Sequence, residues 1–119
     1  MRSTSDKGSR GEDVAVAFLE SRGYNVLRTN FRLGRIGEID IVCTDGRTLV
    51  FVEVKMRLTD RYGRPEDAVG MRKRQQLRRV AHAYLHINRV HDMECRFDVI
   101  AIEFRDGQRY VRHWKNAFF

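Results

Sequence analysis

Three acidic residues and one lysine interrupt two neighbouring apolar stretches of this chain. Glu38 and Asp40 stand in the first stretch, and Glu53 and Lys55 stand in the second. Burying such charges is costly unless a metal ion or a substrate compensates them. Carboxylate oxygens are ligands that suit Mg²⁺ and Mn²⁺, and a lysine beside them can hold an anionic substrate oxygen or an attacking water. The residue types therefore predict a divalent-metal site.

Asp45-Gly46 lies between the two stretches and predicts a hairpin that positions these groups, because this dipeptide between alternating apolar runs is a strong turn signal. With these two residues as the turn, Asp40 faces Phe51 and Glu38 faces Glu53. Asp40 and Glu53 are then a diagonal pair, roughly 7–8 Å apart. Facing carboxylates repel, which favours a shared cation. The alternative is a surface hairpin with a Glu53–Lys55 ion pair. The opposite face would hold Ile39, Ile41 and Cys43.

Asp40, a spacer and Glu53-x-Lys55 on a hairpin resemble the active-site motif of the PD-(D/E)xK nuclease superfamily, which has the restriction-endonuclease-like fold. More narrowly, the chain resembles the YraN-type bacterial proteins, which are similar to archaeal Holliday-junction resolvases. The superfamily often has proline before the aspartate, where this chain has Ile39. The segments that carry the resemblance are Gly11-Glu12, Gly37-Glu38-Ile39-Asp40-Ile41-Val42, Phe51-Val52-Glu53-Val54-Lys55-x-Arg57, Lys73, Ala83-Tyr84-Leu85 and Arg96-Phe97-Asp98-Val99.

The resemblance implies an α/β fold, with a mixed central β-sheet flanked by helices, and metal-dependent hydrolysis of phosphodiester bonds. Asp40 and Glu53 would bind Mg²⁺ or Mn²⁺, which acts as Lewis acid, activator of water and template. Lys55 would orient the water or stabilise charge on the phosphate. Glu38 would take part in catalysis as a metal ligand, as a partner of Lys55 or as both.

Glu12 and Lys73 each have two interpretations. The resemblance makes Glu12 a metal ligand from the first helix, whereas Ser9-x-x-Glu12 also fits a capping box that explains the glutamate locally. Lys73 falls at the edge of the apolar stripe of the second helix, from which it could reach the carboxylates as a catalytic residue. Its alternative is an apolar stem with the ammonium in water.

The basic residues predict a polyanionic partner. The 23 Lys and Arg against 16 Asp and Glu give a formal charge of +7, which favours a polyanion such as nucleic acid through counterion release. Charge alone does not separate DNA from RNA or acidic lipid, and the resemblance implies DNA. Arg57, Arg61 and Arg64 lie in or beside a glycine-containing connection that is either a substrate-contacting loop or an ordinary solvated one. The cluster from Arg72 to Arg79 resembles a nucleic-acid patch, much of which is expected to be a solvated face, with Arg74 a candidate contact.

Other features narrow the class of protein. No run reaches the ~18 apolar residues of a membrane span, and residues 1–10 lack the apolar core of a signal peptide, so we expect a cytoplasmic protein with no membrane partner. Cys43 and Cys95 are expected to be buried free thiols. His82 and His86 have the spacing of a zinc pair, but no glutamate follows His82 and no third ligand is evident.

The length predicts one domain at 9–119, after a flexible tail at 1–8. The first helix is expected at about 9–22, with Val14, Ala17, Phe18 and Ser21 on one face. The second is expected from Pro65 to about Asn88, with an apolar stripe of Leu77, Val80, Ala81, Tyr84 and Leu85. Strands are expected at 24–32, 36–43, 48–57, 95–104 and 108–114.

Taken together, the sequence predicts a magnesium-dependent endonuclease that acts on DNA, with branched or otherwise unusual structures among the candidate substrates. The rival is a nucleic-acid-binding protein that keeps the fold without catalysis. A small RNA-binding protein is a weaker third reading, because no aromatic-rich strand signature is present. A homodimer is a hypothesis motivated by the resolvase resemblance.

Overall fold

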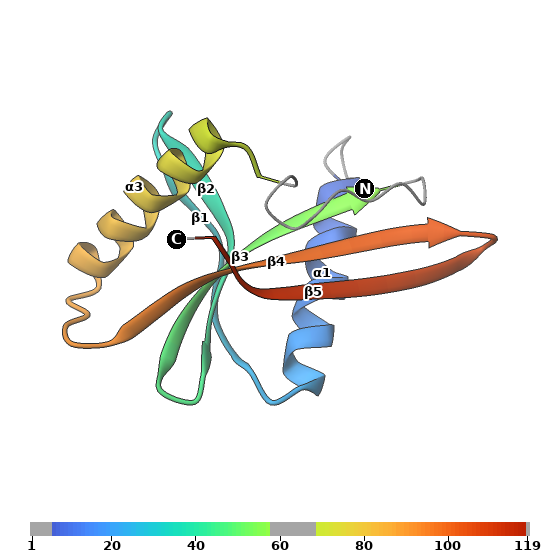
Figure 1. The fold of residues 1–119 in the computed structure, drawn as a ribbon, viewed down its shortest axis with the longest axis horizontal. Helices are drawn as coiled ribbons and strands as arrows, with labels where there is room; N and C mark the ends of the chain where they lie inside the picture. The colour runs from blue at the N-terminus through green and yellow to red at the C-terminus, as the bar shows by residue number, and fades with distance from the viewer. Residues whose placement is uncertain (1–5, 58–68, 119) are drawn as a thin grey trace.

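The chain forms a five-stranded mixed sheet with α1 and α3 packed against it (Figure 1). This computed structural model describes residues 6–57 and 69–118. The strands lie in the order β1-β2-β3-β4-β5, and β3 and β4 are the parallel pair. This α/β architecture confirms the predicted fold class and is consistent with the restriction-endonuclease-like fold. The elements are α1 (Asp6–Ser21), β1 (Asn25–Leu33), β2 (Gly37–Asp45), β3 (Thr48–Arg57), α3 (Met71–Ile87), β4 (Glu94–Arg105) and β5 (Gln108–Phe118).

The helix α1 confirms only part of the predicted face, because Val14 and Phe18 pack against the core. Ala17 and Ser21 are exposed, whereas Gly11, Ala15 and Leu19 are buried at i, i+4 and i+8. A Cβ atom on Gly11 would lie 2.6 Å from Sδ of Met56 on β3. The missing side chain therefore lets the first half of α1 approach the sheet closely.

The helix α3 confirms the predicted apolar stripe but begins later than predicted. Leu77, Val80, Ala81 and Tyr84 are buried, and Leu85 packs beside them. The predicted start at Pro65 lies outside the described residues, but Gly70 has an extended backbone, with φ −69° and ψ 167°. A helix running unbroken from Pro65 is therefore wrong, and α3 starts at Met71.

The sheet separates two apolar cores, one under each helix. Phe51 and Val99 pack with α3, while Val52 and Ile100 pack with α1. Phe118 is buried in the α3 core and Trp114 packs against it, so these two aromatic side chains near the end of the chain dock on the protein. Phe119 lies outside the described residues.

The β2–β3 hairpin has a register two residues away from the predicted one. Asp45 pairs with Thr48, which leaves Gly46 and Arg47 as the two loop residues. Gly46 has φ +60°, as primed hairpin turns require at their first loop position. Val42, and not Asp40, therefore faces Phe51. A shift of two residues keeps each side chain on its face but places Asp40 opposite Glu53.

The sheet divides at this point. The β2–β3 ladder runs from Asp45↔Thr48 to Ile41↔Val52, but β2 stays paired with β1 as far as Gly37, and β3 stays paired with β4 as far as Arg57. Figure 1 shows the β1–β2 ribbon turning away from β3 and β4. Asp40 and Glu53 therefore stand where the two parts of the sheet diverge, which we call the fork.

The predicted alternation along β2 fails at the fork. Ile41 and Cys43 pack in the core under α1, as one face of a strand should, but Ile39 packs in the core under α3. The strand changes the side on which it buries its apolar residues as it passes Asp40. A uniform period of two cannot continue through a strand that leaves its neighbour and turns.

Asp98 is the centre of a buried polar network on the far half of the sheet. Its carboxylate accepts hydrogen bonds from Nε of Arg96 at 3.0 Å and from the backbone N–H of Asn116 at 2.9 Å, and Nε2 of His113 lies 2.7 Å away. Arg96 also reaches Asp45 at 3.1 Å and the hydroxyl of Tyr24 at 2.7 Å. The network ties the β2–β3 turn to β4 and β5.

Both cysteines are free, but only Cys43 is buried. Cys95 is exposed, so the prediction of two buried thiols is wrong for it. Cys95 lies near the start of β4, where its Sγ is 3.5 Å from the carbonyl of Met93.

Among the described residues, no helix combines the length and the apolar character needed to cross a membrane.

Candidate metal centre

The carboxylate of Asp40 takes the place of a backbone acceptor where the sheet forks. The backbone N–H of Val54 donates to Oδ2 of Asp40 at 2.8 Å. β3 has no backbone partner from β2 beyond Val52 in the ladder, so the side chain satisfies an amide that the fork would otherwise leave unpaired. The same contact fixes Asp40 at the mouth of the fork.

Three carboxylates from two elements meet at this point. One oxygen each from Glu12 on α1 and from Glu38 and Asp40 on β2 lie within 4.8 Å of one another, and all three side chains are half-buried. Glu12 reaches the group because Gly11 holds α1 against β3. Opposite ligands of an octahedral Mg²⁺ lie about 4 Å apart, so a small movement of these side chains suffices to enclose an ion.

Glu53 adjoins this cluster and is itself an unusual group. It is 7% exposed, and its Oε2 has no hydrogen-bond partner. Burial, a hydrogen bond shared with Asp40 and repulsion by Asp40 raise the pKa of Glu53 to about 8. A buried oxygen without a hydrogen bond, beside three further carboxylates, is the arrangement that a cation would complete. The residues present therefore fit an oxygen-ligated divalent ion.

Two lysines supply positive charge next to Glu53. Nζ of Lys73, from the first turn of α3, lies 3.8 Å from Oε2 of Glu53, which is an ion pair too long to be a hydrogen bond. Lys55, two residues after Glu53 on the same strand, also lowers the pKa of Glu53 through its charge. Lys73 thus reaches the carboxylates from the α3 side, while Glu12 approaches from the α1 side.

The structure brings together six residues singled out from the sequence: Glu12, Glu38, Asp40, Glu53, Lys55 and Lys73. It does not place the basic candidates beside them as a group. Arg74 donates from Nε to the carbonyl of Val69 at 2.9 Å and lies over the ring of Phe118, so its guanidinium takes part in the fold. The side chain of Arg57, and Arg61 and Arg64 as a whole, lie outside the described residues.

Asn30 is a member of the site that the sequence reasoning missed. In the β1–β2 ladder Thr29 pairs with Ile41 and Phe31 with Ile39, which places Asn30 opposite Asp40. Its backbone has φ 54°, and its side chain is hydrogen-bonded to Glu12. Burial raises the pKa of Glu12 and this hydrogen bond opposes the rise. Asn30 therefore holds Glu12 in position and favours its charged form.

Replacing Asn30 separates its two roles. Asn30→Gly keeps a backbone that accepts positive φ but removes the hydrogen bond, and we expect roughly 10-fold weaker Mn²⁺ binding, as for other residues that orient a metal ligand. Asn30→Ala should lose the same affinity and a further ~1–2 kcal/mol of stability, because alanine resists this backbone conformation. Mn²⁺ titration and urea unfolding measure the two effects. Wild-type affinity in Asn30→Gly would show that Asn30 does not support Glu12.

The raised pKa of Glu53 predicts a pH-dependent cost in the metal-free protein. Protonated Glu53 stabilises the fold fully below pH ~4.5, and this contribution is lost as the pH rises through about 8. Glu53→Gln stays neutral, so it should be more stable than the wild type in chelator at pH 9, by on the order of 2–4 kcal/mol, and nearly equal to it at pH 4.5. Urea unfolding at several pH values measures the difference.

The exposed Glu94 gives the matched control for this experiment. Glu94→Gln makes the same chemical change away from the fork and should leave the pH dependence of the wild type intact. A Glu53→Gln variant whose stability follows that of the wild type at every pH would contradict a raised pKa at Glu53.

Comparison with known sequences places the chain in a family. Residues 11–102 match the profile of the uncharacterised protein family UPF0102. The chain belongs to this family. The UPF0102 protein of Geobacter sulfurreducens is 49% identical over 113 residues, which cover 93% of this chain and 87% of that protein. The UPF0102 protein of Geobacter metallireducens is 47% identical, and the alignment covers 93% of this chain and 90% of that protein. The UPF0102 protein of Syntrophus aciditrophicus is 42% identical, with 93% of this chain and 87% of that protein covered.

The matched region contains the whole candidate site. Residues 11–102 begin one residue before Glu12 and include both strands of the fork and the first turn of α3. The recognition of a YraN-type chain from its motifs is confirmed by this membership. The nuclease superfamily suggested by those motifs is consistent with the UPF0102 assignment and with the observed fold.

Proposed function

We propose that this UPF0102 chain is a divalent-metal-dependent nuclease that hydrolyses phosphodiester bonds in DNA, with branched or structured DNA as the first substrates to test. The observation that carries the proposal is the fork, where oxygens of Glu12, Glu38 and Asp40 lie within 4.8 Å of one another. Beside them, Glu53 has a buried oxygen that no described residue satisfies with a hydrogen bond. A purely structural site has no reason to gather four carboxylates.

In the proposed mechanism, Mg²⁺ or Mn²⁺ would be held by Glu12, Asp40 and Glu53, with Glu38 as a further ligand. The ion would supply Lewis acidity and a more acidic water. The protein holds the ligands in place through the Val54 amide, Asn30 and the packing of Gly11. Fixed charges of this kind stabilise developing charge without reorganisation during the reaction.

The two lysines would act on the substrate. Lys55 would orient the attacking water or hold a phosphate oxygen. Nζ of Lys73 lies 3.8 Å from Oε2 of Glu53, and an ion bound to that carboxylate would leave the ammonium available to the phosphate. The side chain of Lys73 is 41% exposed, so it can turn toward a ligand without unfolding the helix.

The test is a cleavage assay on linear, single-stranded and branched DNA and on RNA, with Mg²⁺, Mn²⁺ or chelator. We expect metal-dependent cutting of DNA that Lys55→Ala lowers by about 10²-fold or more. Tight DNA binding without cutting by any form would instead support the rival function, a nucleic-acid-binding protein that keeps this fold. Cutting that persists unchanged in Lys55→Ala and in Asp40→Ala would come from a contaminant and would reject the proposal.

We further propose that this activity is cytoplasmic, where nucleic acid is at hand and free thiols such as Cys43 and Cys95 stay reduced. Two copies would allow two strands of a branched substrate to be cut together, so a homodimer belongs to the same proposal. Light scattering that finds only monomers at assay concentration, with and without DNA, would reject the dimer.

A further inference from the structure

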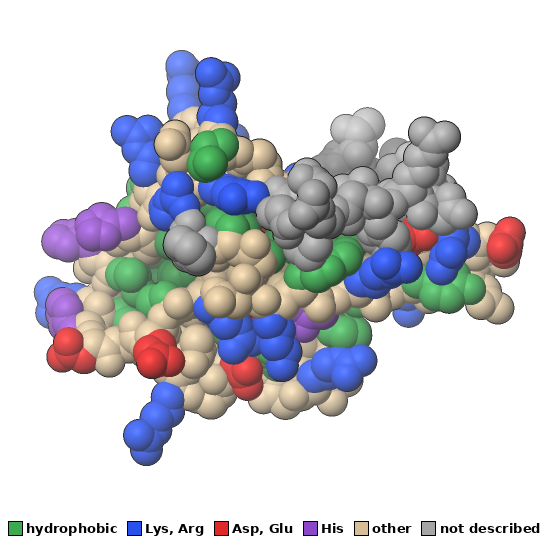
Figure 2. Space-filling view, viewed as in Figure 1, with side chains coloured by type: hydrophobic (Ala, Val, Ile, Leu, Met, Phe, Trp, Pro, Cys, Tyr) green, Lys and Arg blue, Asp and Glu red, His purple; other side chains and the backbone are tan. Residues whose placement is uncertain are grey.

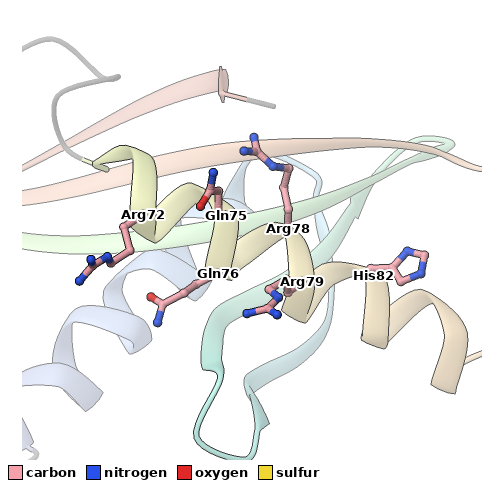
Figure 3. Close-up of a pocket in the computed structure, with 6 residues that line it drawn as sticks. All are labelled: Arg72, Gln75, Gln76, Arg78, Arg79 and His82. Atoms are coloured by element: carbon pink, nitrogen blue, oxygen red, sulfur yellow. The ribbon is translucent and has the colours of Figure 1, made fainter.

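The outward side of α3 carries an open groove of ≈ 690 Å³ (Figure 3). We propose that this groove binds the sugar-phosphate backbone of a nucleic-acid strand next to the bond at the fork. This proposal rests on the proposed function, because a reacting phosphate at the fork would fix where the strand enters the groove. The residues that line the groove are Arg72, Gln75, Gln76, Arg78, Arg79 and His82.

Two of the three arginines that line the groove are exposed to solvent. Arg72 and Arg79 are exposed, and among the interactions of the described residues neither takes part in an ion pair or a hydrogen bond. The 17 residues of α3 include five Lys and Arg and no Asp or Glu. Surface helices usually intersperse acids at i, i+4 to relieve such repulsion. A cationic groove of this composition favours an anionic ligand.

Figure 2 shows Lys and Arg side chains gathered around α3 and the neighbouring end of the β1–β2 ribbon. The glutamines add amide donors between these charges, and arginine and glutamine are common partners of phosphate oxygens. Arg72 and Arg79 are separated by seven residues, or about 10 Å along the helix. That distance matches roughly three nucleotides of one strand of B-form DNA, which advances 3.4 Å per phosphate.

One wall of the groove lies against the strand that carries two of the carboxylates at the fork. A Cβ atom on Gly37 would lie 3.8 Å from Cβ of Gln76, so the first residue of β2 touches the wall of the groove. Glu38 follows directly and belongs to the carboxylate cluster. On the same helix, Lys73 pairs with Glu53. A strand with its reacting phosphate at the fork would therefore place its neighbouring phosphates along α3.

The experiment measures binding of a fluorescein-labelled DNA branch and its single strands in chelator, so that binding is separated from cleavage. Arg72→Gln/Arg79→Gln removes two exposed arginines of the groove and keeps good helix formers. Arg47→Gln/Arg109→Gln is the matched control, because both residues are exposed on hairpin ends and the loss of formal charge is the same. Circular dichroism checks that both double variants fold.

We expect the groove variant to bind about 10-fold or more weakly and its slope of log affinity against log salt to fall by about 1.5–2, for two lost phosphate contacts. The control should change much less. Equal losses in the two variants would show a general field effect and overturn the proposal. If the groove variant lost binding to a labelled polyglutamate peptide but bound DNA like the wild type, the groove would be assigned to an acidic protein. That result would also overturn the proposal.

Failure of the groove and failure of the proposed function give different results. If the wild type never cuts DNA but the groove variant alone loses binding, the groove binds nucleic acid and the nuclease proposal falls. If the wild type cuts DNA and the groove variant binds and cuts like the control, the nuclease stands and the groove proposal falls.

Discussion

Asp40→Asn should lower metal-dependent cleavage by about 10³-fold or more while leaving the fold intact. The amide has the same shape, and its oxygen can still accept the hydrogen bond from Val54. The asparagine side chain has no negative charge to bind an ion. It also no longer repels the carboxylate of Glu53. The variant therefore removes charge at the centre of the cluster and little else. Cleavage rates under single-turnover conditions, with thermal unfolding beside them, measure the effect.

Asp92→Asn is the matched control for this variant. Asp92 is exposed after α3 and has φ 55°, a conformation that asparagine adopts readily. The control should cut DNA at the wild-type rate. An Asp40→Asn variant that retains activity within a few-fold of the control would show that the fork is not the catalytic centre.

Asp98→Ala should destabilise the protein by roughly 3–5 kcal/mol, a large part of the stability of a domain this size. The substitution leaves Arg96, His113 and the amide of Asn116 without the acceptor that joins them. Burial alone would raise the pKa of Asp98, but the hydrogen bonds from His113, Arg96 and Asn116 outweigh it and lower the pKa. The carboxylate therefore stabilises the fold at neutral pH, and this contribution is lost as the pH falls through its lowered pKa.

Asp45→Ala tests whether the position in the network matters. Asp45 is a second partner of Arg96, but its side chain is 40% exposed, so its loss should cost ~1 kcal/mol or less. Urea unfolding at neutral pH compares the two variants. Equal, small losses would mean that the Asp98 network contributes little to stability.

The elements of the fold could be predicted because each follows a local pattern. The stripe from Leu77 to Tyr84 repeats with the period of a helix, and β3 has the predicted bounds 48–57. The face of the hairpin that carries Asp40 and Glu53 was also predicted, although its register was not. Asp45-Gly46 and Gly46-Arg47 are both compatible with a two-residue loop. Because the two registers differ by two residues, both place the same side chains on the same face.

The features that the sequence did not reveal depend on contacts between distant elements. Ile39 packs under α3 because β2 leaves β3 at the fork, and no local period records that divergence. The packing face of α1 was predicted only in part, and its closest contact with β3 was missed because Gly11 has no side chain to count as apolar. Asn30 offered one weak signal, an asparagine within a strand, since asparagine tolerates positive φ better than most residues.

Candidate ligands were easier to recognise than their arrangement. Residue type alone singled out Glu38, Asp40 and Glu53, because carboxylates in apolar strands need an explanation. The observed register, extended one residue beyond Ile41↔Val52, places Asp40 opposite Glu53, whereas the predicted register placed the two on a diagonal. That difference explains why Glu53 shares a hydrogen bond with Asp40 and has a raised pKa.

Titration with Mn²⁺, followed by calorimetry and by electron paramagnetic resonance, tests most directly whether the fork binds a divalent ion. At pH 7 we expect saturable binding to the wild type with release of protons, because Glu53 must lose its proton to become a ligand. Binding should be lost in Asp40→Asn and retained in Asp92→Asn. No saturable binding to the wild type, or equal binding to all three proteins, would contradict a metal centre at the fork.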